Sequence, residues 1–174
     1  LVVSSGTATF TNDVEIGDAT VASGASLRLA GAGTSFALKE NGTLTLDGET
    51  TTTGTLSANT IRVLSAASLT ADFSKISVGD TLTVNMDATA TLTIDTAGAV
   101  VDKLQVDGAV TLTGGNAFSL ATLRGSGTVE KTGAGALTLG ASADFAGTLK
   151  ISDGAAELGA GATFGSERSR LEFL

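Results

Sequence analysis

Two groups of charged residues have the types and spacing that acid–base chemistry needs. Asp47 and Glu49 are separated by one glycine, and Asp102, Lys103 and Asp107 lie close together further along the chain. Paired carboxylates that flank a glycosidic bond carry out glycoside hydrolysis. Carboxylates at turns, however, normally accept hydrogen bonds from backbone N–H groups and face water. We therefore interpret both groups as turn carboxylates and predict a protein that is not an enzyme.

The missing residue types narrow the chemistry further. The sequence has no histidine and no cysteine, which excludes Ser-His-Asp and Cys-His catalysis and the usual zinc sites. Gly114-Gly115-Asn116 begins but does not complete the calcium-binding repeat G-G-x-G-x-D. The Gly-x-Gly pairs at 125–127 and 133–135 lack the G-K-[ST] of a phosphate loop, so we interpret them as turns. We predict no metal site and no cofactor, with a weak surface calcium site as the alternative.

Composition and charge limit the partners. The net charge is −8, and no run of lysine or arginine occurs. Such a surface repels phosphates, so neither nucleic acid nor an anionic membrane is expected as a partner. No apolar run reaches the roughly 20 residues that a membrane-spanning helix needs, and we predict no direct membrane insertion. A hydrophobic content of 42% with 16% charged residues is typical of a folded chain.

The elements that must carry these residues are short strands. Apolar residues alternate with polar ones at period two, which is the strand period. The predicted strands include 27–29, 36–38, 44–46, 61–63, 76–78, 82–86, 92–94, 104–106, 110–112, 118–120, 137–139, 149–151 and 171–173. Turn signals separate them at 41–42, 47–48, 78–80, 107–108, 114–116 and 153–154. Only residues 60–75 are ambiguous between helix and strand.

Evenly spaced short strands with short connections predict an all-β fold, namely a single-stranded right-handed parallel β-helix of about seven to nine rungs. A β-sandwich is the alternative. The chain from residue 1 to residue 174 is predicted to form one continuous solenoid segment. Each rung takes roughly 20 to 25 residues and rises about 4.8 Å.

Two further sets of residues bear on the surface. Thr50 to Thr53 is the most polar run, and it predicts either a protruding loop that could bind a partner or a strand with outward threonines. The phenylalanines occur in alternating contexts, so we expect them to stack inside the solenoid rather than form an adhesive patch. This expectation covers all seven phenylalanines of the chain, among them Phe10, Phe36, Phe118, Phe145 and Phe164.

The most distinctive stretch runs from residue 125 to residue 158. Its spacing, G-x-G-x-[aliphatic]-x-K-x-G-x-G-x-L-x-L followed by aromatic-x-Gly, resembles the passenger-associated transport repeat, also called the autotransporter-associated β-strand repeat, of bacterial autotransporters. The sequence departs from the family's frequent Asn-Thr-Tyr at 143–145 and from its frequent Gly-Thr-Leu ending at 155–158. The matching positions are Gly125, Gly127, Val129, Lys131, Gly133, Gly135, Leu137, Leu139, Phe145, Gly147, Thr148 and Ile151.

The resemblance implies a non-enzymatic shaft that is secreted or displayed at the cell surface, on the outer membrane of a Gram-negative-type bacterium. Partners would be a host-cell, matrix or glycan surface, and an outer-membrane barrel would lie outside this chain. Because residues 1–5 show no initiating methionine and no secretion signal, we expect an excerpt of a longer surface protein.

Two alternatives from other classes stay open. Strands at both ends of the sequence, around Val2-Val3 and Leu171-Glu172-Phe173, have edges that could pair with copies of the same chain and build filaments. A polysaccharide-active β-helix enzyme is the other alternative, and it would have to use the carboxylates described above.

Overall fold

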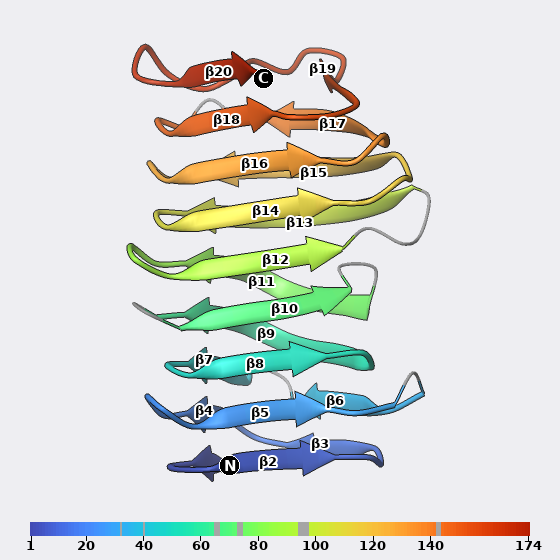
Figure 1. The fold of residues 1–174 in the computed structure, drawn as a ribbon, viewed down its shortest axis with the longest axis vertical. Helices are drawn as coiled ribbons and strands as arrows, with labels where there is room; N and C mark the ends of the chain where they lie inside the picture. Colours follow the sequence, from blue (N-terminus) through green and yellow to red (C-terminus); the bar gives the residue numbers. More distant parts are fainter. Residues whose placement is uncertain (32, 40, 65–66, 73–74, 94–97, 142–143) are drawn as a thin grey trace.

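Alternating apolar residues give this chain strands along its whole length, as the sequence predicts. The computed structural model describes residues 1–31, 33–39, 41–64, 67–72, 75–93, 98–141 and 144–174. These form a right-handed parallel β-helix of about eight turns with almost no helix, in which the strands stack one above another from the N-terminus to the C-terminus (Figure 1). The predicted fold class and number of rungs are confirmed. Within the described residues, no helix has the length and apolar character required to span a bilayer.

Two parallel sheets form the walls of the solenoid. Sheet B contains one strand per turn, in the order β2 (Thr7–Phe10), β5 (Ser26–Leu29), β8 (Glu49–Thr52), β10 (Ser68–Asp72), β12 (Thr89–Thr93), β14 (Ala109–Thr113), β16 (Thr128–Thr132), β18 (Thr148–Ile151) and β20 (Arg170–Phe173). Sheet A contains β1 (Val2–Val3), β3 (Val14–Ile16), β4 (Ala19–Val21), β6 (Ser35–Leu38), β7 (Thr43–Leu46), β9 (Thr55–Val63), β11 (Ile76–Val84), β13 (Ala99–Val106), β15 (Phe118–Arg124), β17 (Ala136–Ala141) and β19 (Ala155–Leu158).

The first turns build sheet A differently from the later ones. There, two short strands share each turn, whereas from β9 to β17 one longer strand per turn pairs along the same wall, with β9 contacting both β6 and β7. The length of a turn also varies. Thr7 pairs with Ser26, 19 residues further on, and Ser26 pairs with Glu49, 23 residues further on. The register therefore absorbs insertions at the corners without interrupting the ladders.

The interior is a stack of apolar side chains in register. Leu82, Leu104 and Leu123 occupy successive turns of sheet A and are almost completely buried. Each such side chain stabilises the fold by about 1.5 to 3 kcal/mol. Parallel stacking places like residues on top of one another because every turn repeats the same path.

Of the six described phenylalanines, five lie in or against the core as expected, and the expectation is wrong for Phe173, which is 71% exposed. Phe36, Phe118 and Phe145 are buried, and Phe10 and Phe164 pack against the core. The rings form two tilted pairs, with centroids 5.5 Å apart for Phe10 and Phe36 and 6.0 Å apart for Phe145 and Phe164. These pairs lie near the two ends of the stack.

One local expectation is wrong, and one ambiguity is resolved. Residues 78–80, predicted as a turn, lie within β11, where the register with β9 shifts between Val78 and Thr81. The turn signal there marks a strand irregularity, because an inserted residue needs the same conformational freedom that a turn does. Residues 60–63 and 68–72 of the ambiguous segment are strand.

Candidate functional site

Among the described residues, the carboxylates Asp47, Glu49 and Asp107 do not gather into one cluster. Asp47 lies in the turn between β7 and β8, and Glu49 begins β8 on the outer surface. Asp107 is held at the end of β13, where it accepts hydrogen bonds from the amide of Gln105 at 3.1 Å and from the backbone N–H of Ser126 at 3.1 Å. The Asp107 carboxylate therefore has the turn-capping contacts that the sequence predicts.

The other members of these groups are Asp102 and Lys103 in β13. The side chain of Asp102 lies outside the described residues, and Lys103 is exposed on sheet A. Among the described residues, no three Asp or Glu side chains gather as a metal site would require.

The polar run from Thr50 to Thr53 is not a protruding loop: it forms the end of strand β8 and the residue after it, and only Thr51 and Thr53 face outward. Thr50 and Thr52 belong to β8 and point into the core, where they are 0% and 4% exposed. Within the part of the chain that the structure describes, the Thr50 hydroxyl has no hydrogen-bond partner. Sequence reasoning missed this because threonine is more often outward on a half-buried strand, whereas the in-register neighbours Leu27 and Leu69 show that position 50 faces inward.

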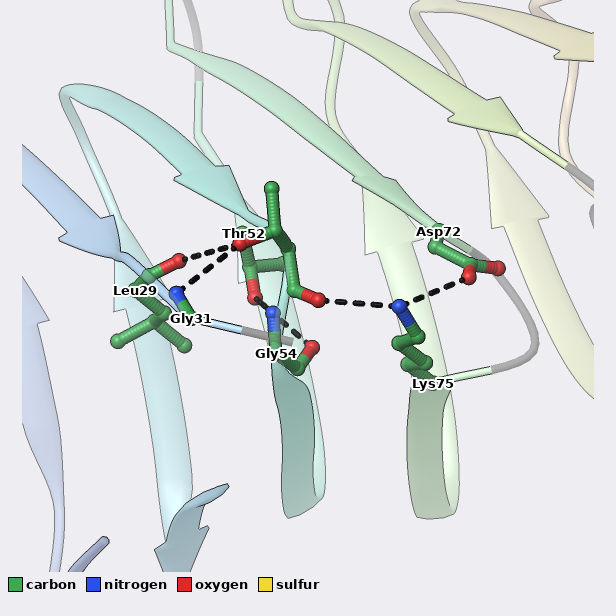
Figure 2. A network of polar contacts seen from close by, with 7 residues as sticks. Leu29, Gly31, Thr52, Gly54, Asp72 and Lys75 are labelled. Atoms are coloured by element: carbon green, nitrogen blue, oxygen red, sulfur yellow. Dashed lines mark hydrogen bonds and ion pairs between the residues drawn. The ribbon is translucent and has the colours of Figure 1, made fainter. Parts of the chain in front are cut away.

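The segment that leads from a sheet B strand into the next sheet A strand is here called the B–A corner. Figure 2 shows this corner over three turns, after β5, β8 and β10. The Thr52 hydroxyl donates to the Gly54 carbonyl at 3.0 Å and accepts from the Gly54 N–H at 3.2 Å. The neighbouring Thr53 hydroxyl accepts from the Gly31 N–H at 3.2 Å and donates to the Leu29 carbonyl at 3.3 Å.

A partly exposed lysine, Lys75, bonds to this part of the corner. The Lys75 ammonium donates to the Thr53 carbonyl at 3.1 Å and lies 3.4 Å from the Asp72 carboxylate (Figure 2). Its side chain is 36% exposed. The contacts tie the corner after β10 to the corner after β8.

A second lysine, in the interior of the solenoid, also joins the corners of two successive turns. Lys131 in β16 is 0% exposed and occupies the interior position between Leu112 and Ile151. Its ammonium donates to the Gly133 carbonyl at 2.5 Å and to the Asp153 carbonyl at 2.7 Å, so it joins the B–A corners of two successive turns. Burial lowers the pKa of Lys131, and the nearby Asp153 carboxylate opposes part of that change.

The other residues of the repeat-like stretch occupy packing and corner positions. Its aliphatic and aromatic members, Val129, Leu137, Leu139, Phe145 and Ile151, are buried. Thr148 begins β18 and is partly buried. Its glycines lie at close backbone approaches: a Cβ on Gly125, Gly127, Gly133, Gly135 or Gly147 would come within 2.5 Å of a carbonyl oxygen of the preceding turn.

Two hollows lie among the described residues on the outer face of sheet A. One, of about 260 Å³, is lined by Thr81, Lys103, Gln105, Thr122 and Arg124 on β11, β13 and β15. The Arg124 side chain is 59% exposed and its guanidinium lies 3.3 Å from the Asp144 carboxylate.

The other hollow, of about 370 Å³, lies toward the N-terminus on the same face. It is lined by Lys39, Asn41, Ser57, Asn59 and Ser77. Sequence reasoning missed both hollows because their residues come from different turns.

Comparisons with known proteins leave the chain without an assigned relative. No family model, no curated protein and no solved structure matches it.

Proposed function

We propose that this chain is a non-enzymatic shaft segment that spaces and presents binding surfaces on a secreted or cell-surface protein. The observation that carries the proposal is the continuous parallel pairing of both sheets over about eight turns, which continues across the register shift between β9 and β11. Such a stack holds its two ends at a fixed separation, because each turn adds about 4.8 Å along one axis. The resemblance of residues 125–158 to the transport repeat supports a surface location on a Gram-negative-type bacterium.

The absence of cysteine fits export of the chain to the cell surface. A chain without cysteine forms no disulfide before export. The partners proposed for the shaft are a host-cell, matrix or glycan surface, with an outer-membrane barrel outside this chain as the anchor.

Removing one whole turn tests the shaft. Glu49 and Ser68 are register partners, so deletion of residues 49–67 joins β7 to β10 with the ladder of sheet B in phase. We expect the variant to fold and to be shorter by about 4.8 Å in small-angle scattering, and to be displayed as well as the parent when fused to an outer-membrane barrel. Loss of folding, loss of display, or turnover of any glycan by the parent chain would contradict a passive shaft.

Self-stacking is a second candidate, and exposed apolar side chains at one end favour it. Leu171 and Phe173 continue the inward columns of Leu149 and Ile151, yet they are 46% and 71% exposed. A turn stacked on β20, supplied by a longer chain or by a second copy, would cover them. Light scattering of the 174-residue chain at rising concentration decides between these sources, since a constant monomer mass excludes self-stacking.

A further inference from the structure

We propose that the outer face of sheet B binds the surface of ice crystals. The inference rests on the proposed function for one point, a location outside the cell, and the ligand goes beyond the partners named above. The site consists of the outward residues of β10, β12, β14 and β16, which we call the threonine lattice. These strands lie one above another in the middle of the solenoid (Figure 1).

Threonine dominates this part of the sheet. On β12 every outward residue is a threonine, namely Thr89, Thr91 and Thr93. Thr70 on β10 and Thr111 on β14 are the register partners of Thr91, so its nearest lattice neighbours along the strand and across the strands are all threonine. Thr70, Thr89 and Thr91 are exposed, and Thr93 and Thr111 are half-buried.

The register of sheet B turns these residues into a regular array. From β10 to β16 each strand pairs with the next without a shift, whereas sheet A shifts its register between β9 and β11. Outward residues therefore repeat at about 4.8 Å along the axis and at about 6.6 Å along each strand, which is twice the rise per residue. The result is a two-dimensional lattice of hydroxyl and methyl groups.

Ice has a surface lattice with closely similar repeats. Each water molecule in ice is hydrogen-bonded tetrahedrally to its neighbours, at an O···O distance of about 2.75 Å. Tetrahedral geometry converts this distance into repeats of about 4.5 Å along one crystal axis and about 7.3 Å along the perpendicular axis. Both repeats agree with those of the threonine lattice to within about a tenth. Water molecules held by the threonines therefore stand close to the positions that ice requires.

Threonine side chains suit an ordered layer of water. The hydroxyl group both donates and accepts hydrogen bonds, and the methyl group beside it restricts the orientations of adjacent water molecules. Branching at Cβ restricts χ1, so each hydroxyl has few positions to lose on binding. Because the scaffold is also a continuous hydrogen-bonded sheet, the lattice is preorganised and binding costs little conformational entropy.

The lattice is interrupted only near its edges. Serine or threonine occupies every outward position of β10, β14 and β16 except Asp72, Ala109 and Glu130. The Asp72 carboxylate lies 3.4 Å from the Lys75 ammonium, and its side chain is only 12% exposed. The Glu130 carboxylate accepts a hydrogen bond from the Ser152 hydroxyl at 2.7 Å. Both acids therefore have partners on the outer strands of the lattice, and Ala109 still contributes a methyl group.

The lattice fits ice better than other ligands. Small-molecule sites are concave, whereas side chains of equal size on a continuous sheet form an even surface. Single-stranded nucleic acid needs cations and aromatic platforms, and the outward residues of β10, β12, β14 and β16, all of them described, include neither. Outward charges reappear on the flanking strands, at Glu49 of β8 and Lys150 of β18, which confines the site to the strands between them.

Thermal hysteresis and partition into growing ice test the site with the 174-residue chain. We expect the chain to separate the freezing from the melting temperature of ice and to be incorporated into a slowly growing ice hemisphere. Thr91→Tyr raises a ring above the centre of the lattice and should abolish both effects, and Thr111→Lys on the next strand should do the same. Thr45→Tyr, the matched outward substitution on β7 of sheet A, should leave both unchanged.

Tyrosine is favoured in strands, and urea unfolding of each variant checks that the fold is kept. Exclusion of the parent chain from ice, full activity of a folded Thr91→Tyr or Thr111→Lys variant, or an equal loss in folded Thr45→Tyr would each overturn the inference. A rise in mass with concentration that Thr91→Tyr abolishes would also overturn it, because a second copy would then cover the lattice.

These measurements use the free chain in solution and need neither display nor a barrel. A failed lattice therefore leaves the display and scattering results of the shaft unchanged, and a failed shaft leaves the ice binding of the parent chain unchanged.

Discussion

The B–A corner uses a lysine ammonium twice, once from outside the solenoid and once from inside. Lys75 reaches the Thr53 carbonyl from a partly exposed position beside Asp72. Lys131 reaches the Gly133 and Asp153 carbonyls from a position with no exposure at all. Both join two successive turns, but only the inner lysine replaces a core side chain.

The difference shows that burial decides how much a lysine–carbonyl contact contributes to the stability of the fold. An exposed ion pair gains little, because solvent already satisfies both partners. A buried ammonium loses its hydration, and its removal leaves carbonyl groups without donors in the interior. The same chemistry should therefore be marginal after β10 and critical after β16.

The largest expected effect comes from truncating the inner lysine. Lys131→Ala should lower the free energy of unfolding by about 3 to 5 kcal/mol, because it opens a cavity and leaves two carbonyls unpaired. Lys131→Met keeps most of the volume and should cost about 1 to 2 kcal/mol. Lys75→Met, the matched outer substitution, should cost at most about 1 kcal/mol. Urea denaturation measures all three, and equal costs for the two Met variants would remove the distinction between the corners.

A glycine beside the inner lysine provides the next test. Gly154 has φ of +77°, and a Cβ there would lie 2.6 Å from the Lys131 ammonium and 2.7 Å from the Gly133 carbonyl. Gly154→Ala should cost about 2 to 3 kcal/mol from strain and contact together. Gly24 has φ of +74° with open space around it, so Gly24→Ala should cost only about 1 kcal/mol. If thermal or urea unfolding gives the same loss of stability for Gly154→Ala and Gly24→Ala, the groups around the Lys131 ammonium are not tightly packed.

The two inward threonines of β8, Thr50 and Thr52, should respond to the same substitution with opposite changes in the free energy of unfolding. Thr50→Val removes a buried hydroxyl that has no hydrogen-bond partner among the described residues and should stabilise the protein by about 1 kcal/mol. Thr52→Val removes the two contacts to Gly54 and should destabilise it by about 1 kcal/mol. Both variants keep side-chain volume, so their unfolding curves isolate the hydroxyl. Destabilisation by Thr50→Val would indicate that its hydroxyl is satisfied in solution.

The smallest expected effect is a pH dependence. Burial lowers the pKa of Lys131 below the ordinary value of 10.5, so between the folded pKa and 10.5 the unfolded chain binds more protons than the folded one. Stability contributed by this group therefore rises as pH increases through that window and is constant above it. Subtracting the Lys131→Met curve removes the contribution of the other lysines. A difference that falls with pH would contradict the desolvation of Lys131.

Much of the fold was readable from residue patterns. Alternation such as Leu137-Thr138-Leu139 fixes which residues can face a core, and short spacing between turns favours stacked rungs over a sandwich. The alternation of side chains along a strand also predicts the inward position of Lys131. Val129 and Lys131 are two residues apart on β16, so an inward Val129 places Lys131 inward as well. The turn signal at 78–80 failed because a strand irregularity and a turn use the same residue types.

The sequence by itself determined that this chain has strands, an apolar interior, no histidine or cysteine chemistry and an acidic surface, because these depend on composition and local periodicity. Tertiary structure decided which turns lie next to each other. Only that register places Lys131 beneath the Asp153 carbonyl, 22 residues away, and Lys103 one turn from Arg124 on the same face. The physical reason is that register depends on the length of each corner, and corner lengths act only when successive turns stack.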